Sequence, residues 1–266
     1  MSDSQMAFDE ERSKALLHVY RGEAVTARRR EALRALDLKP GERLLDVGSG
    51  PGLFATEAAE QLAPGGSVLG IDVSPDMIAV AERVRDESPH KDAIEFHEAA
   101  AAKLPVDDGA FDVAVSIQVL EYVDDVDGAL AEIYRALRPG GRALIWDTDW
   151  GGVTAHTEDP ERHARLMRAL DEHCQHVALP RTLPTRLRAV GFTLRYAAPY
   201  CMLDLDGGPD SLIGGLEPMM LAFVKGRQGV TDEDIAGWAA EQKALREEGR
   251  FFFSSPQFYF VADKPA

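Results

Sequence analysis

The sequence has few cysteines, no long apolar segment and a shortage of positive charge. Only Cys174 and Cys201 occur among 266 residues, too few by themselves for a structural zinc site and typical of two unpaired thiols in a reducing compartment. No apolar run approaches the ~20 residues that a membrane helix needs. The N-terminal residues are polar and acidic, unlike a signal peptide. These absences predict a soluble, cytoplasmic protein.

Basic residues are outnumbered. Lys and Arg total 29 against 45 Asp and Glu, which gives a formal net charge of −16. Nucleic-acid affinity comes largely from basic residues that meet phosphates, and anionic membranes attract basic segments in the same way. The charge therefore argues against a nucleic-acid partner and against a membrane partner.

What the sequence does contain is an alternation of short apolar runs with helical stretches, which is typical of a parallel sheet flanked by helices. A first helix is expected over about 12–38, and Lys39-Pro40-Gly41 ends it. Strands are expected at 43–47, 68–73, 94–98, 111–117, 142–147, 192–200 and 251–262. Further helices are expected at 53–62, 76–85, 126–137, 161–177, 182–190 and within 203–249. In the last of these, Thr231 and Asp234 resemble a capping box.

A glycine-rich loop, Gly48-Ser49-Gly50-Pro51-Gly52, joins the first expected strand to the next helix. Glycines let the backbone approach a ligand closely, and the N–H groups at a helix N-terminus bind carboxylate or phosphate. By itself such a loop is equally compatible with an ordinary strand-to-helix turn. Asp72, however, ends the second strand 20 residues after Gly52, where a carboxylate can accept both hydroxyls of a ribose. Together the loop and Asp72 indicate a ligand that contains adenosine.

The sequence around this loop resembles the class I S-adenosylmethionine-dependent methyltransferases. Five motifs follow in that family's order, at residues 44–52, 70–78, 104–112, 119–123 and 137–141. The resemblance is to the broad branch that includes ubiquinone and menaquinone C-methyltransferases and many natural-product enzymes. A nicotinamide dehydrogenase would need G-x-G-x-x-G, and Leu53 stands at the place of its third glycine.

The resemblance implies an α/β fold, namely a Rossmann-like, seven-stranded, mostly parallel sheet whose last strand is antiparallel, with helices on both faces and a helical cap. Residues 1–39 are then an N-terminal helical lid. Residues 40–202 are the S-adenosylmethionine-binding core, with a helical insertion at about 157–180. Residues 203–249 are a helical cap insertion, and residues 250–266 are the final strand of the core.

The resemblance also implies how the cofactor, S-adenosylmethionine, is held. Gly48 and Gly50 would face its methionine part, Asp72 its ribose, and Val73 and Met77 would flank its adenine. The full set of expected cofactor-binding residues is Asp46, Gly48, Gly50, Gly52, Asp72, Val73, Met77, Ala101, Ala102, Gln118 and Tyr20.

Some of these assignments leave alternatives open. Asp46 is expected to brace the loop or to face the cofactor's amino group, and Tyr20 to close over the cofactor or to pack in the core. The family often has an aspartate where this chain has Ala100, so adenine would rely on the backbone of Ala101 and Ala102 or on another side chain. The family's common histidine is replaced by Tyr122.

The basic residues and histidines outside the motifs are expected at the surface. Arg28, Arg29 and Arg30 are predicted to form a solvated face, with the alternative that one of them meets the cofactor carboxylate. Surface positions on a polar helix are also predicted for His163, His173 and His176.

The residues that bind the methyl acceptor are harder to predict from the sequence. Methyl transfer from a sulfonium is a one-step displacement that depends mainly on how donor and acceptor are positioned. A base is needed only when the acceptor loses a proton. Asp149 and His156, after the fifth strand, are the candidate general bases, although they are equally compatible with a turn cap and a solvated histidine. Trp150, Glu217 and Met220 are the candidate pocket residues, and no metal is expected.

The predicted function is methyl transfer to the oxygen, nitrogen or carbon of a small, partly apolar or aromatic metabolite. Residues 116–119 read Ser-Ile-Gln-Val, not the Asn/Asp-Pro-Pro-Tyr run of enzymes that methylate the exocyclic amines of bases. The alternatives are an RNA or protein methyltransferase and a non-catalytic S-adenosylmethionine-binding protein. A monomer and a homodimer both remain open.

Overall fold

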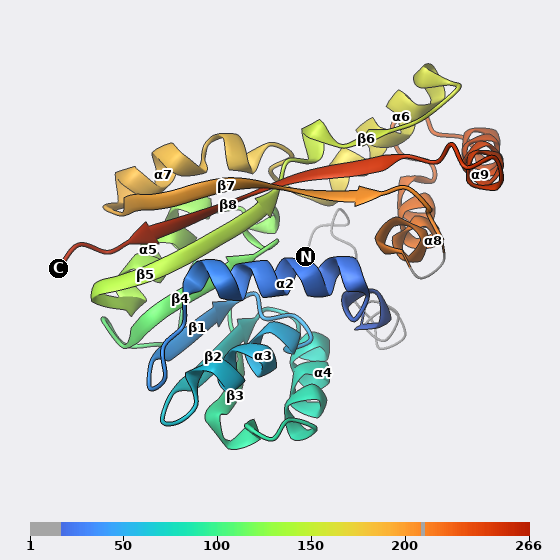
Figure 1. Cartoon of the computed structure of the whole chain (residues 1–266). Helices are drawn as coiled ribbons and strands as arrows, with labels where there is room; N and C mark the ends of the chain where they lie inside the picture. The colour runs from blue at the N-terminus through green and yellow to red at the C-terminus, as the bar shows by residue number, and fades with distance from the viewer. Residues whose placement is uncertain (1–16, 209–210) are drawn as a thin grey trace.

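The computed structural model describes residues 17–208 and 211–266, and one twisted sheet with helices on both faces lies at its centre (Figure 1). The strand order is β3-β2-β1-β4-β5-β8-β6, and β7 also pairs with β8. The strands are β1 Arg43–Val47, β2 Ser67–Asp72, β3 Ile94–Glu98, β4 Phe111–Ile117, β5 Leu137–Thr148, β6 Thr154–Ala155, β7 Thr193–Asp204 and β8 Phe253–Asp263.

The first five strands run parallel, and β8 is antiparallel to its neighbours β5 and β7. This confirms the expected α/β, mostly parallel sheet with an antiparallel last strand. Eight strands are present instead of seven because the short segment β6 pairs with the beginning of β8. The central strands β1 and β4 are buried over most of their length, as expected when both faces of a parallel sheet are covered by helices.

Two apolar clusters fix the helices to the two faces of the sheet. One cluster joins the sheet to α5 and α7, and the other joins it to α2 and α3. The helices are α2 Glu23–Leu36, α3 Leu53–Leu62, α4 Pro75–Asp86, α5 Val126–Ala136, α6 Pro160–Leu170, α7 Leu183–Val190, α8 Leu212–Val224 and α9 Asp232–Glu247. The first expected helix is interrupted at Arg21–Gly22, just before α2, and its residues 12–16 lie outside the described part of the chain.

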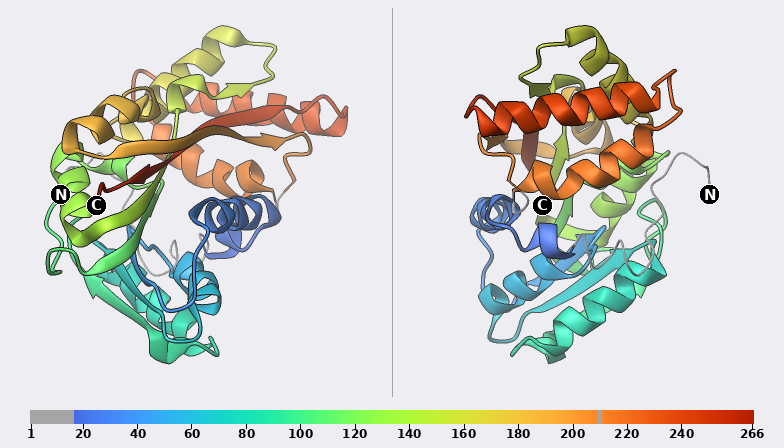
Figure 2. Two further views of the ribbon diagram at one scale, coloured as in Figure 1. Left: turned by 60° about the vertical axis from the view of Figure 1, so that its left-hand side comes forward. Right: turned by 90° about the vertical axis from the view of Figure 1, so that its right-hand side faces the viewer.

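Three helices, α6, α8 and α9, gather at the end of the molecule toward which β7 runs (Figures 1 and 2). An apolar cluster that includes Leu166, Val224 and Trp238 holds them together. The predicted capping box is confirmed at the start of α9: Thr231 Oγ1 accepts the N–H of Asp234, and Asp234 Oδ2 accepts the N–H of Thr231, both at 3.1 Å. No helix in the described ranges is long and apolar enough to cross a membrane.

Candidate functional site

The candidate site lies where the carboxyl ends of β1, β4 and β5 meet. The sheet order reverses between β1 and β4, because β2 and β3 follow on one side and β5 on the other. Ligands of open α/β sheets bind at such a reversal, outside the carboxyl ends of the strands. The glycine loop after β1, Gln118 after β4 and Asp149 after β5 are therefore brought to one edge.

The glycine loop follows β1 and has three glycines in the left-handed region, with φ of 76° at Gly48, 51° at Gly50 and 76° at Gly52. The N–H groups of Gly48 and Ser49 both donate to the carbonyl of Ile71, at 2.7 and 2.9 Å. The loop is thereby fixed to the end of β2, which carries Asp72.

The three glycines have different surroundings. A Cβ on Gly48 would lie 2.1 Å from Val119 Cγ2, and one on Gly52 would lie 2.7 Å from the ring of Phe96. A Cβ on Gly50 would meet no atom within 4 Å. The first and third glycines are therefore required by close packing, whereas the middle one borders open space that a ligand can occupy.

Asp72 is the second fixed point of the site. Its two carboxylate oxygens accept the N–H groups of Gly50 and Ser74, each at 2.9 Å. Burial raises the pKa of this carboxyl, and the backbone donors oppose that rise. Val73 beside it is 71% exposed, while Met77 is buried in the first turn of α4. An apolar surface thus lies next to a carboxylate, which suits a ribose with an attached base.

The turn that contains Ala101 and Ala102 follows β3 and lies beside the end of β2, because the N–H of Ala99 donates to the carbonyl of Asp72 at 3.0 Å. Ala101 and Ala102 are both half-buried. The structure therefore brings these two residues, predicted from the resemblance, to the same side of the site as Val73.

Three buried polar atoms around the loop have no hydrogen-bond partner among the described residues: Asp46 Oδ2, Ser49 Oγ and Arg28 Nε. Burial raises the pKa of Asp46 to about 7, and the nearby Asp72 adds to that rise. A carboxyl group, a hydroxyl group and a guanidinium are together complementary to an ammonium and a carboxylate. The site therefore fits the α-amino-acid end of S-adenosylmethionine.

The predicted solvated face on α2 is wrong for two of its three arginines. Arg28 and Arg29 are each only 7% exposed, and Arg30 alone points outward. The cause is helical periodicity, since α2 packs against the sheet and turns two successive positions inward. Arg28 donates to Gln118 Oε1, and Arg29 forms an ion pair with Glu57 at 2.8 Å.

Gln118 and Tyr20 border the same space. Gln118 has a φ of 55°, uncommon for a residue with a Cβ, and its Nε2 donates to Thr148 Oγ1 at 2.6 Å. Burial raises the pKa of the Tyr20 phenol. The nearby Arg28 lowers this pKa, whereas Asp72 and Glu121 raise it further. The N-terminal segment therefore approaches both the cofactor loop and the ends of β4 and β5.

Two buried acids at this edge are absent from the sequence-based list of site residues. Glu121 and Asp147 are both fully buried. Burial raises the pKa of Glu121 to about 7, and burial together with the neighbouring Glu121 raises that of Asp147 well above its ordinary value. Glu121 interrupts the largely apolar stretch 117–123, and Asp147 interrupts the largely apolar stretch 143–148. This pattern is the sequence signal that could have indicated two buried acids.

Trp150 extends from the turn after β5 into this group. Its Nε1 donates to Glu121 Oε1 at 3.0 Å. Its ring packs edge to face against the imidazole of His173, with 4.4 Å between the ring centroids. The predicted surface position of His173 is wrong, since this residue is 3% exposed. After α6 ends, a short turn at Asp171–His173 directs the imidazole inward, and its Nδ1 lies 2.6 Å from the carbonyl of Leu170.

The two candidate bases have contrasting surroundings. Asp149 is 7% exposed, and both of its oxygens accept N–H groups of Arg181 at 2.9 Å. The side chain of His156 is 36% exposed, and its Nε2 lies 3.7 Å from Glu158. Asp149 is thus held by an ion pair, and His156 faces solvent.

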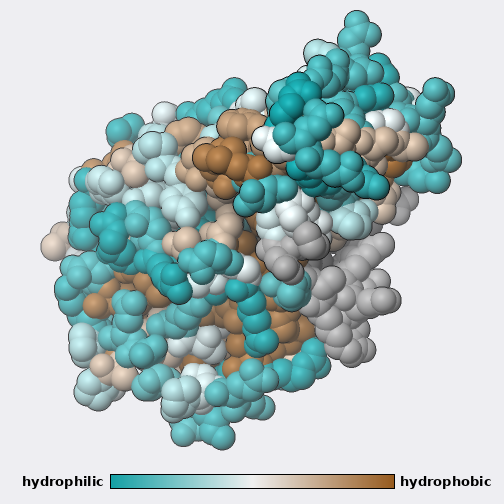
Figure 3. Space-filling view, turned by 45° about the vertical axis from the view of Figure 1, so that its right-hand side comes forward, coloured by the Kyte–Doolittle hydropathy of each residue, from teal (hydrophilic) through white to brown (hydrophobic). Residues whose placement is uncertain are grey.

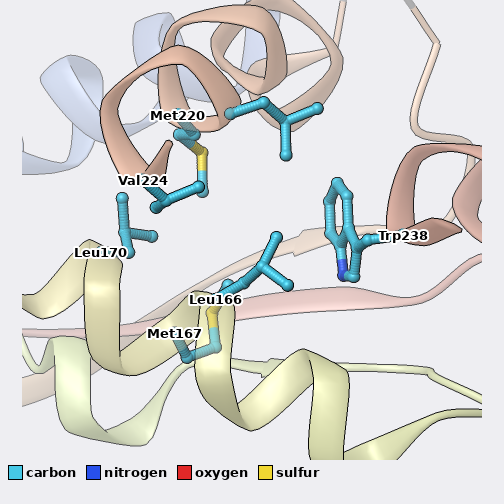
Figure 4. Close-up of a pocket in the computed structure, with 7 residues that line it drawn as sticks. Leu166, Met167, Leu170, Met220, Val224 and Trp238 are labelled. Atoms are coloured by element: carbon cyan, nitrogen blue, oxygen red, sulfur yellow. The ribbon is translucent and has the colours of Figure 1, made fainter. Parts of the chain in front are cut away.

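In the cap, Met220 lines two small apolar hollows that share Met167 and Trp238, and Figure 4 shows the one that Leu166, Leu170 and Val224 also line. Glu217 is not free in this region, because it forms an ion pair with Arg246. Apolar surface is also visible in the middle of the face shown in Figure 3, below the largely hydrophilic projecting cap. No group of three potential metal ligands occurs within the described parts of the chain.

The fold and the loop suit an adenosine-containing cofactor, and comparison with known proteins indicates which one. Residues 45–145 match the methyltransferase domain family. An uncharacterized 37.1 kDa protein of transposon TN4556 from Streptomyces fradiae is 34% identical over 186 residues, which are 70% of this chain and 53% of that protein. The demethylmenaquinone methyltransferase of Symbiobacterium thermophilum is 38% identical over 115 residues, 43% of this chain and 46% of the enzyme.

The chain thus spans about half the length of these relatives in each match. Among solved structures, phosphoethanolamine N-methyltransferase 2 of Haemonchus contortus, bound to phosphomonomethylethanolamine and S-adenosylhomocysteine, superposes with a TM-score of 0.62 at 21% identity. That superposition covers 97% of this chain and 58% of the other, and it concerns the fold. Residues 45–145 are thus similar to a methyltransferase domain, and the match and these relatives support S-adenosylmethionine as the cofactor.

Proposed function

We propose that this protein transfers the methyl group of S-adenosylmethionine to the oxygen, nitrogen or carbon of a small, partly apolar or aromatic metabolite. The observation that carries the proposal is the set of unpartnered buried polar atoms on Asp46, Ser49 and Arg28, at the edge of the sheet where Gly50 borders open space. Aromatic side chains, Trp150 among them, lie at the same edge of the sheet.

In this proposal different residues bind different parts of the cofactor. Gly48, Gly50 and Gly52 shape the loop for the methionine part, Asp46 attracts its ammonium group, and Arg28 attracts its carboxylate. The cofactor supplies a methyl group on a sulfonium, which needs no further activation.

The rest of the cofactor would lie along the end of β2. Asp72 accepts the ribose hydroxyls, and Val73 and Met77 cover the adenine. The backbone of Ala101 and Ala102 contacts the adenine edge. Gln118 and Tyr20 close the side that faces the acceptor.

The chain's main contribution to the reaction is alignment and the exclusion of water, because a direct displacement depends on the distance and angle between donor and acceptor. We propose residues 1–39 as a lid and 203–249 as a cap over the core 40–202, with its insertion at about 157–180 and its final strand in 250–266. Trp150, Met220 and Glu217 would form the acceptor side. Glu217 would act there only after release from Arg246.

For an acceptor that loses a proton, Asp149 and His156 are the proposed bases, and they differ in what each requires. Asp149 would first have to leave Arg181, to which it makes two hydrogen bonds. The side chain of His156 is 36% exposed and makes no such ion pair with an arginine among the described residues. Acceptors whose attacking atom is already unprotonated need neither residue.

Methylation of RNA or protein is the main alternative acceptor class, and the net charge of −16 disfavours RNA. A non-catalytic S-adenosylmethionine-binding protein would keep the same loop. Calorimetry with S-adenosylmethionine tests cofactor binding, and transfer of labelled methyl groups to a panel of phenols, amines and polyketide-like compounds tests the acceptor. Label appearing only in RNA or protein would contradict the small-molecule proposal, and binding without transfer to any acceptor would favour the non-catalytic alternative.

A further inference from the structure

The carboxylate of Glu121 joins the turn after β4 to the segment after β5. Its Oε2 accepts the N–H of Thr148 at 2.8 Å, and its Oε1 accepts the indole Nε1–H of Trp150 at 3.0 Å. The side chain is fully buried. A buried carboxylate is stabilised by such donors, so Glu121 has a defined orientation and imposes one on Trp150.

Asp147 makes the reverse connection. Its Oδ1 accepts the backbone N–H groups of Val119 and Glu121, at 3.2 and 3.3 Å. Each acid thus binds the backbone of the segment that carries the other. The ends of β4 and β5 are held at a fixed separation at the edge where the cofactor loop lies.

The indole of Trp150 is constrained on a second side by His173, and His173 also contacts Phe223 of α8 at a ring-centroid distance of 6.4 Å. This series of rings leads from Glu121, beside the cofactor loop, to the cap. Trp150 is only half-buried, so part of this residue remains accessible. An accessible aromatic ring in a fixed orientation is a stacking surface for a planar ligand.

We propose that Glu121 is the positioning residue of the acceptor site, because it fixes the Trp150 indole as the wall against which a planar aromatic acceptor stacks. This inference rests on the proposed methyltransferase function and specifies its acceptor class. It assigns to Glu121 no contact with the reacting atoms.

The protonation state of Glu121 determines how strongly it holds Trp150. The titratable groups that face it are Tyr20 and Arg28 from the N-terminal segment, Tyr122 from its own turn, Asp147 from β5 and Cys174 after α6. Glu121 and Asp147 interact electrostatically, so their ionisation belongs to the pair. As the pH rises through about 7 and negative charge develops on the pair, the hydrogen bond from the indole to Glu121 becomes charge-assisted and stronger.

The first test follows the indole N–H resonance of Trp150 by NMR, assigned by its loss in Trp150→Phe. In the wild-type protein this resonance should titrate with a midpoint near pH 7. In Glu121→Gln the titration should disappear, and the N–H should exchange with solvent at least about tenfold faster, since a hydrogen bond to a charged group is lost. Glu60→Gln, an exposed carboxylate on α3, is the matched control and should leave the resonance unchanged.

The second test measures binding of 2-naphthol, a planar aromatic probe, in the presence of S-adenosylhomocysteine. Glu121→Gln should weaken naphthol binding about fivefold or more, which is about 1 kcal/mol, and change S-adenosylhomocysteine affinity less than twofold. Trp150→Phe keeps a ring but lacks the N–H donor, so it should weaken naphthol binding similarly. The double variant should lose no more than either single variant, because both substitutions break one contact.

Three results would overturn the proposal: an unchanged Trp150 resonance in Glu121→Gln, equal losses of naphthol and S-adenosylhomocysteine affinity, or no naphthol binding by the wild-type protein. If Glu121→Gln fails to fold, Trp150→Phe alone still decides the stacking role. A wild-type protein that binds both ligands but methylates no acceptor would contradict the proposed function and leave the positioning role intact.

Discussion

The carboxylate of Asp72 accepts the backbone N–H of Gly50 at 2.9 Å, so the end of β2 directly holds the middle of the glycine loop. The same carboxylate is proposed to bind the ribose. One residue therefore both shapes the loop and contacts the ligand, and cofactor affinity should depend on it strongly.

Replacement of Asp72 by alanine should raise the dissociation constant for S-adenosylmethionine by about tenfold to a hundredfold, because hydrogen bonds to a charged group contribute about 1.5–3 kcal/mol each. Isothermal titration calorimetry measures this constant. Asp92→Ala, an exposed acid before β3, is the control and should bind normally. An unchanged affinity in Asp72→Ala would argue against the proposed cofactor site.

Alanine at Gly48 and at Gly50 should have different consequences. At Gly48 the new methyl group meets Val119, so the free energy of unfolding should fall by about 2–4 kcal/mol. At Gly50 only the positive φ is costly, about 1 kcal/mol, but the methyl group enters the space proposed for the ligand. Gly50→Ala should therefore fold and bind S-adenosylmethionine poorly.

Urea unfolding and calorimetry separate the two effects. Adding Val119→Ala to Gly48→Ala should restore part of the lost stability, since it removes the two nearest atoms. No rescue by this second substitution, or normal cofactor binding by Gly50→Ala, would contradict the geometry of the loop.

The stability of the cofactor-free protein should fall as the pH rises from about 4 to 7, in part because of Asp46. Its pKa is raised from 3.8 to about 7 by burial and by Asp72. The unfolded chain therefore releases this proton at lower pH than the folded protein does, and the penalty reaches about 4 kcal/mol at most above pH 7. Below about pH 4 both states are protonated and Asp46 has no such effect.

Asp46→Asn removes this titration while keeping the shape of the side chain. In urea unfolding the variant should be more stable than the wild type at pH 8, and the difference should shrink toward pH 4. Glu121 and Asp147 destabilise both proteins in the same direction, so they cancel in the comparison. An equal difference at both pH values would show that folding does not shift the pKa of Asp46, and would contradict this prediction.

The ion pair between Asp149 and Arg181 should contribute to stability, because it fixes the turn after β5. In a double-mutant cycle with Asp149→Ala and Arg181→Ala, we expect a coupling energy of about 1 kcal/mol, limited by the exposure of Arg181. Thermal or urea unfolding of the four proteins gives this energy. Additive effects would indicate that Asp149 is free for another role, such as that of a base.

Sequence patterns were sufficient for the glycine loop and for every described strand except the short β6, because both depend on local apolar runs and on residues next to one another. They failed for Arg28, Arg29 and His173, whose burial depends on which face of an element packs inward. Each of these residues is polar and was therefore expected at the surface. Its partners, such as Gln118 for Arg28, come from distant parts of the chain.

The acid pair Glu121 and Asp147 shows the same limit at the site itself. Glu121 belongs to a family motif, and Asp147 lies at the end of a strand. The sequence context of each residue therefore gives no sign of its contact with the other. Their mutual support appears only when β4 and β5 are adjacent. Long-range contacts of polar side chains are not encoded in hydrophobic periodicity.

The position of β8 has a consequence for biosynthesis. This strand separates β5 from β7, and Arg142 pairs with Asp263, about 120 positions later in the chain. Until residues 253–263 have left the ribosome, β5 has an open edge and β7 has no partner strand in the described sheet. Open edges invite pairing with other chains. The nascent sheet is therefore most exposed to aggregation before β8 is made, and β8 ends this exposure because it covers the edge of β5 and pairs with β7.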